Sequence, residues 1–73
     1  MENKELIKKL KKEQAKLGKK LLKLTTFLMD QEDSQTVSDL QLKLLNVQRD
    51  AMLAYSNVLE IRIDDLKETG NND

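Results

Sequence analysis

The stretch VSDLQLKLLNVQRDAMLAYSNVLEI, residues 37–61, carries the strongest structural pattern in this chain. Its apolar residues recur at alternating intervals of three and four, the spacing of a helix face that packs along a partner helix. The positions that keep this alternation unbroken are Val37, Leu40, Leu44, Val47, Ala51, Ala54, Val58 and Ile61. We therefore predict a long helix over about residues 37–67, with these positions as its seam.

A second helix is predicted upstream, over about residues 4–29. Its seam has the same alternation and a single polar interruption; its members are Ile7, Leu10, Gln14, Leu17, Leu21, Leu24 and Leu28. Turn-forming residues gather at 30–36. Ser38 followed by Gln41 fits a capping box that begins the later helix, and Thr36 followed by Asp39 is a competing cap. A connection this short joins antiparallel neighbours, so the sequence predicts an all-α fold, a two-helix antiparallel hairpin.

One partner helix would leave part of the later helix uncovered. Beside its seam lie further apolar residues, several of them repeating every seven positions: Leu42, Leu45, Met52, Leu53, Leu59, Ile63 and Leu66. A single neighbour covers one stripe of a helix, and domains below ~70–80 residues commonly gain stability by oligomerising. We therefore predict one helical-hairpin domain over residues 1–73, with a disordered tail at 68–73, that assembles into a symmetric homo-oligomer through its later helix.

Composition excludes several classes of function. The 73 residues contain no Cys and no His, which removes thiolate and imidazole metal ligands and the usual general base near neutral pH. We therefore expect no metal site, no cofactor and no catalytic residue, and so no enzyme. No apolar run reaches the roughly 18 residues of a membrane span, and the charged N-terminus lacks a signal-peptide core, so we expect a cytoplasmic protein.

Charge is unevenly distributed along the chain. Residues 1–24 hold nine Lys against three Glu, a net charge of +6, whereas residues 25–73 hold four Lys or Arg against ten Asp or Glu, a net charge of −6. The basic segment by itself would suit DNA, RNA or an anionic membrane, but the acidic remainder argues against those partners. The two segments can instead neutralise each other, within one hairpin or between chains.

Three polar side chains form a row beside the seam of the later helix. Gln48, Tyr55 and Arg62 recur every seven residues, so they lie on one line at intervals of about 10.5 Å. As the polar margin of a helix interface, they would form hydrogen bonds across it or pack against it. As a binding site, Tyr55 would stack on a purine and Arg62 would hold a phosphate through two parallel hydrogen bonds. Spacing alone leaves both interpretations open.

Lys20 and Thr26 extend this candidate binding site with a cation and a hydroxyl. They lie towards the loop end of the first helix, which an antiparallel hairpin places beside the start of the later helix. Only a neighbouring subunit would therefore bring them to Arg62. Their other interpretation is a solvated helix surface.

The residues around this row also resemble a known family. The patterns LL-x2-Q-x3-M-x2-Y-x3-L-x2-RI at residues 44–63 and L-x3-L-x2-L-x2-FL at residues 17–28 are similar to those of short helical-hairpin proteins of bacteriophages, including crAss-like phages. The hairpin is also similar to that of phage anti-CBASS and anti-Thoeris sponges. This resemblance implies a symmetric oligomer in the host cytoplasm that sequesters a cyclic oligonucleotide or a cyclic ADP-ribose derivative without cleaving it. It implies Arg62, Tyr55 and Gln48 as ligand contacts.

Two functions follow as expectations. The principal one is an immune-evasion sponge for a cyclic nucleotide second messenger, with binding residues Arg62, Tyr55, Gln48, Lys20 and Thr26. The alternative is a non-catalytic oligomerisation or adaptor module, whose apolar faces bind a host or phage protein by helix packing. The row distinguishes them, because only the sponge needs Arg62 and Tyr55 for its activity.

Overall fold

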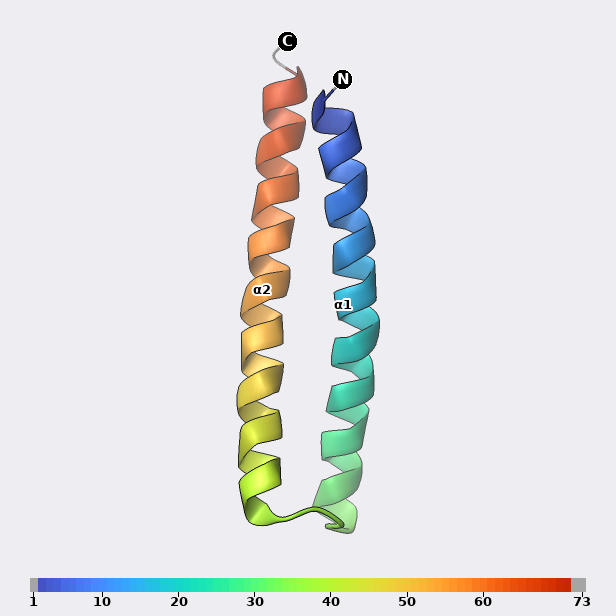
Figure 1. Cartoon of the computed structure of the whole chain (residues 1–73), viewed down its shortest axis with the longest axis vertical. Coiled ribbons are helices and arrows are strands. Elements are labelled where there is room, and N and C mark those ends of the chain that lie inside the picture. Colours follow the sequence, from blue (N-terminus) through green and yellow to red (C-terminus); the bar gives the residue numbers. More distant parts are fainter. Residues whose placement is uncertain (1, 72–73) are drawn as a thin grey trace.

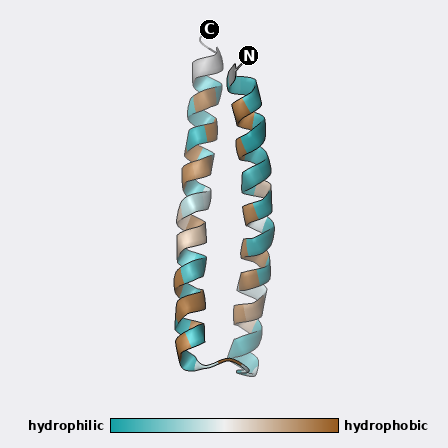
Figure 2. Cartoon of the chain, viewed as in Figure 1, coloured by the Kyte–Doolittle hydropathy of each residue, from teal (hydrophilic) through white to brown (hydrophobic). Residues whose placement is uncertain are grey.

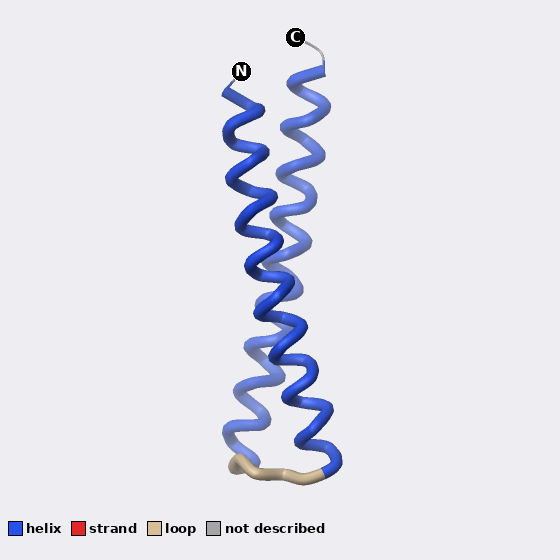
Figure 3. Tube along the Cα trace, turned by 90° about the vertical axis from the view of Figure 1, so that its right-hand side faces the viewer, coloured by secondary structure: helices blue, strands red, loops and turns tan. Residues whose placement is uncertain are grey.

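The chain folds into two long helices that lie side by side and antiparallel (Figure 1). The structure is a computed structural model, which describes the backbone of residues 2–71 and the side chains of residues 3–68. Helix α1 spans Glu2–Asp33 and helix α2 spans Asp39–Asn71. The hairpin is a rod of 54 × 15 × 14 Å, and its helices cross in the view turned by 90° (Figure 3). The predicted all-α antiparallel hairpin is therefore confirmed.

The first helix is longer than the sequence predicts. α1 ends at Asp33 instead of residue 29, and the loop occupies residues 34–38. The backbone N–H of Ser34 donates to the carbonyl of Asp30 at 3.0 Å, which continues the helical pattern to the last turn. The acidic residues that suggested a turn therefore complete α1 instead.

The second helix begins later than predicted, so the predicted loop at 30–36 is shifted along the chain. α2 starts at Asp39 instead of residue 37. The hydroxyl of Ser38 accepts a hydrogen bond from the backbone N–H of Gln41 at 3.2 Å. Ser38 thus caps the helix as its spacing indicated, satisfying one of the N–H groups that have no partner inside the helix.

The second helix also ends later than predicted. α2 continues past residue 67 and through Gly70 to Asn71, although a glycine inside a helix costs ~1 kcal/mol relative to alanine. The part of the predicted tail at 68–73 that the structure describes is therefore helical. Residues 72–73 lie outside the described part of the chain.

One buried glutamine organises the loop. Gln31 is 7% exposed, and its side-chain oxygen accepts from the backbone N–H of Thr36 at 2.8 Å and of Val37 at 3.2 Å. Its side-chain nitrogen donates to the Thr36 hydroxyl at 2.8 Å. Gln35 adds bonds to the Val37 carbonyl at 2.8 Å and to the Asp39 carboxylate at 2.7 Å. These bonds satisfy the loop backbone and set where α2 turns back along α1.

The face of α2 that packs on α1 is not the predicted seam. The packed stripe comprises the α2 residues that are buried or half-buried: Leu42, Leu45, Arg49, Met52, Ser56, Leu59, Ile63 and Leu66. The predicted seam faces away from α1 and forms the exposed stripe: Leu40, Leu44, Val47, Ala51, Ala54, Val58 and Ile61. Hydrophobic residues consequently run along most of α2, whereas the N-terminal half of α1 is mostly hydrophilic (Figure 2).

Side-chain size explains this choice of stripe. The seam of α1 is confirmed, since all its positions are buried or half-buried, and it consists mainly of leucines. The packed stripe offers long Leu, Met and Ile side chains to it, which remove more apolar surface from water than the exposed stripe with Ala51 and Ala54 at its centre. The tightest cluster lies towards the open end of the hairpin, where Leu10 contacts Leu59 and Ile63.

Candidate functional site

A hydrogen bond between the helices indicates which residue of α1 lies opposite the candidate binding residues of α2. The Tyr55 hydroxyl on α2 donates to the Glu13 carboxylate on α1. This hydrogen bond, partial desolvation and the negative charge of Glu13 raise the pKa of Tyr55, against a lowering effect from the positive charge of Arg62. Tyr55 is still 42% exposed, so much of its ring remains accessible.

The antiparallel arrangement also indicates which other residues of α1 and α2 lie opposite each other. A step of seven residues advances about 10.5 Å along either helix and returns to nearly the same side of it. Because α1 and α2 run in opposite directions, residues on this side lie level across the helices. The pairs, all exposed, are Leu6 with Arg62, Glu13 with Tyr55, Lys20 with Gln48, and Phe27 with Gln41. We call these residues the Tyr55 face.

The Tyr55 face combines positive charge, aromatic rings and amides. Arg62 and Lys20 supply cations against the single carboxylate of Glu13, so the face is positive overall. Phe27 is 38% exposed and, with Tyr55, offers ring surface for stacking on a flat ligand. Cations that can pair with a phosphate and rings that can stack on a base lie together here, so the chemistry of the face suits binding of an anion.

Four of the five predicted binding residues share this face. Gln48, Tyr55 and Arg62 lie along α2, and Lys20 lies beside Gln48, about 21 Å from the level of Arg62. The hairpin thus brings Lys20 to the loop-side end of the row, as an antiparallel arrangement requires. Thr26 lies outside the face, because it precedes Phe27 by one residue and a helix turns about 100° per residue.

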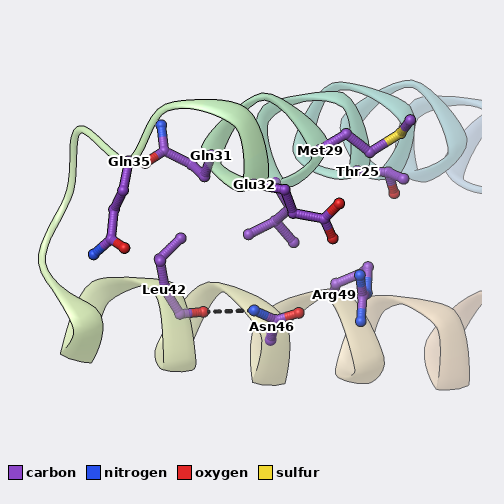
Figure 4. Close-up of a pocket in the computed structure, with 9 residues that line it drawn as sticks. Thr25, Met29, Gln31, Glu32, Gln35, Leu42, Asn46 and Arg49 are labelled. Carbon is purple, nitrogen blue, oxygen red and sulfur yellow. Dashed lines mark hydrogen bonds between the residues drawn. The ribbon is translucent and has the colours of Figure 1, made fainter.

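The opposite flank of the hairpin carries a groove near the loop. Its volume is about 320 Å³, and residues of both helices point into it (Figure 4). The groove is lined by Thr25, Leu28, Met29, Gln31, Glu32, Gln35, Leu42, Asn46 and Arg49. The Asn46 side chain donates to the Leu42 carbonyl at 2.8 Å. None of the predicted binding residues lines this groove.

Arg49 is the residue in this groove that the sequence did not single out. It is half-buried in the packed stripe, and its guanidinium lies 3.8 Å from the Asp50 carboxylate. With Glu32 also lining the groove, the nearby carboxylates outnumber this cation and disfavour an anionic ligand. A charge at the spacing of the packed stripe is the signal that identifies Arg49, but spacing by itself predicts the exposed stripe as the seam.

The described residues lack a cluster of potential metal ligands and a helix that could span a membrane. Among them, no group of His, Cys, Asp or Glu side chains is arranged to hold a metal ion. Neither described helix contains an apolar window sufficient to cross a bilayer.

Comparison with known proteins identifies a family match. The sequence profile of the Sequestin family matches residues 4–65, which include most of both helices, the loop and every residue of the Tyr55 face. The chain belongs to the Sequestin family. The name Sequestin indicates sequestration of a ligand, which agrees with the expectation of a protein that sequesters its ligand. No curated protein and no solved structure matches the chain.

Proposed function

We propose that this Sequestin chain is a bacteriophage anti-defence sponge, a homo-oligomer that sequesters a cyclic nucleotide immune signal in the cytoplasm of the infected cell. It binds a cyclic oligonucleotide or a cyclic ADP-ribose derivative and releases it unchanged. The observation that carries this proposal is the register of the hairpin, which gathers Arg62, Tyr55, Gln48 and Lys20 on one face. Membership of a family named for sequestration supports the same activity.

Each group on the face has a role in this proposal. Arg62 binds a phosphate through charge-assisted hydrogen bonds, and Lys20 adds a second positive charge. The ring of Tyr55 stacks on a base, and Gln48 forms hydrogen bonds with a base edge. The link between Tyr55 and Glu13 holds the ring between the two cations, which reduces the entropy lost on binding.

A thermal-shift screen tests the proposal. Purified protein is heated with cyclic dinucleotides, cyclic trinucleotides, cyclic ADP-ribose isomers and the corresponding linear nucleotides. We expect one cyclic ligand to raise the melting temperature, since ligand at 100-fold its Kd stabilises the folded state by about 2.7 kcal/mol. Chromatography of the ligand after heat denaturation of the complex should recover it intact.

Two variants separate binding by the face from general charge attraction. Arg62→Ala should abolish the shift, whereas Lys67→Ala, which removes an exposed cation from another side of α2, should retain it. No shift with any cyclic ligand, or an equal loss in both variants, would contradict the proposal.

The exposed stripe favours a second candidate function. Its apolar side chains would fit an adaptor module that binds a host or phage protein by helix packing. In that case the double variant Arg62→Ala with Tyr55→Ala would bind its protein partner normally. For the sponge, the same variant loses ligand and keeps its oligomeric state.

A further inference from the structure

The exposed stripe of α2 lacks a partner in the described hairpin. Its large side chains are among the most exposed of the chain: Leu40 at 64%, Leu44 at 51%, Val47 at 59%, Val58 at 49% and Ile61 at 68%. An apolar stripe of this length beside a small core is typical of a helix interface.

The order of residues along this stripe is nearly palindromic. Read outwards from a centre between Met52 and Leu53, both directions meet an alanine, then a valine, then a leucine or isoleucine. The matched positions are Ala51 with Ala54, Val47 with Val58, and Leu44 with Ile61. A surface that is its own match under reversal fits a second copy of itself in antiparallel orientation about a two-fold axis.

We propose that two copies of this chain pair through their exposed stripes, with α2 antiparallel to the partner's α2 and the axis between Met52 and Leu53. Each matched position then contacts its counterpart, so that Val47 packs against Val58 of the partner subunit. The alanines at the centre allow the two helices to approach closely, while the larger residues fill the space towards each end.

The charges beside the stripe favour the antiparallel orientation. On one flank, Lys43 lies within about 3 Å along the helix axis of the partner's Asp64, and Asp50 lies equally near the partner's Asn57. A parallel pair about an axis along the helices would instead place Lys43 and the partner's Asp64 on opposite flanks, where they do not meet. The antiparallel arrangement therefore forms two symmetry-related attractions between Lys43 and Asp64 that a parallel pair lacks.

The pairing also completes the Tyr55 face, and this step rests on the proposed function. On α2 the exposed and packed stripes lie roughly 150° apart on the side that carries Gln48, Tyr55 and Arg62. Two hairpins joined through the exposed stripes therefore form a four-helix layer that is concave on that side. The two-fold axis brings both Tyr55 faces to the concave side, with Gln48 within about 3 Å, along the helix axis, of Tyr55 of the partner subunit.

The ligand chemistry follows from this symmetry. Each half of the cleft contributes Arg62, Lys20 and an aromatic ring, so the dimer presents two cationic groups related by the axis. At the centre of the cleft, the Tyr55 rings of the two halves stand about 7.5 Å apart along the helices, whereas the two Arg62 side chains stand about 28.5 Å apart at its ends. A compact cyclic ligand with two bases therefore meets both halves at the centre, whereas a linear mononucleotide meets one. We therefore expect the cleft to prefer cyclic ligands that carry two bases.

Paired cysteine variants test the dimer directly. The chain contains no cysteine, so Val47→Cys and Val58→Cys each introduce one thiol. Under mild oxidation we expect a disulfide-linked dimer when the two variants are mixed and little when either is oxidised alone. In the antiparallel dimer, identical thiols stand about 16.5 Å apart along the axis, beyond the reach of a disulfide. Circular dichroism checks that both variants remain helical.

Two results would overturn the interface. Disulfides within each variant alone would indicate parallel helices, and no disulfide in the mixture would indicate that the stripe does not meet a second copy in this way. A charge exchange gives an independent measurement: Lys43→Glu should weaken dimerisation roughly tenfold, and adding Asp64→Lys should restore it. An unchanged dimer in Lys43→Glu would contradict the assigned register.

The shared cleft and the proposed function fail separately. If the mixed disulfide forms and no cyclic nucleotide shifts the melting temperature, the interface stands and the sponge does not. If Lys43→Glu is monomeric and binds a cyclic nucleotide as tightly as the unaltered chain, the sponge stands and the shared cleft is wrong. Weaker ligand binding in Lys43→Glu, recovered with Asp64→Lys, supports both.

Discussion

The packed and exposed stripes of α2 repeat at the same intervals of three and four residues, and this spacing does not predict which of them packs on α1. The packed stripe is interrupted by Arg49 and Ser56 and is nevertheless the one against α1, whereas the exposed stripe is apolar throughout and has no partner within the described hairpin. Long side chains decide the first contact, because they bury more apolar surface. An unbroken apolar pattern therefore identifies an interface without identifying its partner.

The largest expected effect comes from removing a side chain of the packed stripe. Leu59 is fully buried, so Leu59→Ala should lower the free energy of unfolding by about 2–5 kcal/mol. Urea unfolding followed by circular dichroism would measure this loss, and the loss should appear at low protein concentration as well as at high.

The matched control lies in the exposed stripe. Ile61 is 68% exposed in the hairpin, so Ile61→Ala should cost little in dilute protein and more as the concentration rises and copies associate. Equal losses for both variants at every concentration would remove the distinction between the stripes.

The loop joins α1 to α2, and Gln31 holds the loop. Gln31→Ala removes the acceptor for the backbone N–H groups of Thr36 and Val37 and should cost about 1–3 kcal/mol. Thermal unfolding should show a smaller loss for Gln35→Ala, because the bonds of Gln35 are exposed to water. A larger loss for Gln35→Ala would indicate that Gln31 does not organise the turn.

A gain in stability is expected from a substitution on the exposed surface of α1. Apart from the adjoining residues and backbone of α1 itself, nothing lies within 4 Å of the position that a Cβ on Gly18 would take, so Gly18→Ala should stabilise the helix by ~1 kcal/mol. Ala15→Gly, at another exposed position of α1, should give a loss of similar size. If Gly18→Ala is instead destabilising, a second copy approaches α1 at this glycine.

The smallest expected effect concerns the hydrogen bond from Tyr55 on α2 to Glu13 on α1. Tyr55 is the single tyrosine of the chain, so the ultraviolet absorbance of tyrosinate reports its ionisation alone. Glu13→Gln removes the negative charge and should lower the pKa of Tyr55 towards its usual value. An unchanged titration would show that Tyr55 and Glu13 are not in contact in solution.

The same shift has a defined consequence for stability. Because folding raises the pKa of Tyr55, the neutral phenol is favoured in the folded state. Its contribution is fully present below the pKa of an unfolded tyrosine and is lost as the pH rises through the folded-state pKa. Alkaline unfolding should therefore depend less steeply on pH in Glu13→Gln.

Much of the fold and part of the candidate site follow from the sequence. The seam of α1 and the hairpin itself are periodic or local features, so their spacing is sufficient to predict them. Spacing offers both Ser38 and Thr36 as caps of α2, and the hydrogen bond to the Gln41 N–H identifies Ser38. Spacing does not predict the end of α1, because Gln31 holds it through bonds to residues beyond the helix. Arg49 was overlooked because its position gains meaning only once the packed stripe is known.

The sequence by itself determined two amphipathic helices, an absence of cysteine and histidine, and a row of Gln48, Tyr55 and Arg62 along one line of a helix. Only the tertiary structure decided which stripe of α2 packs on α1, and with it that Lys20 joins the row and Thr26 does not. The physical reason is that helical periodicity fixes angles around one axis, whereas the register between two helices depends on side-chain volume and on the loop that joins them.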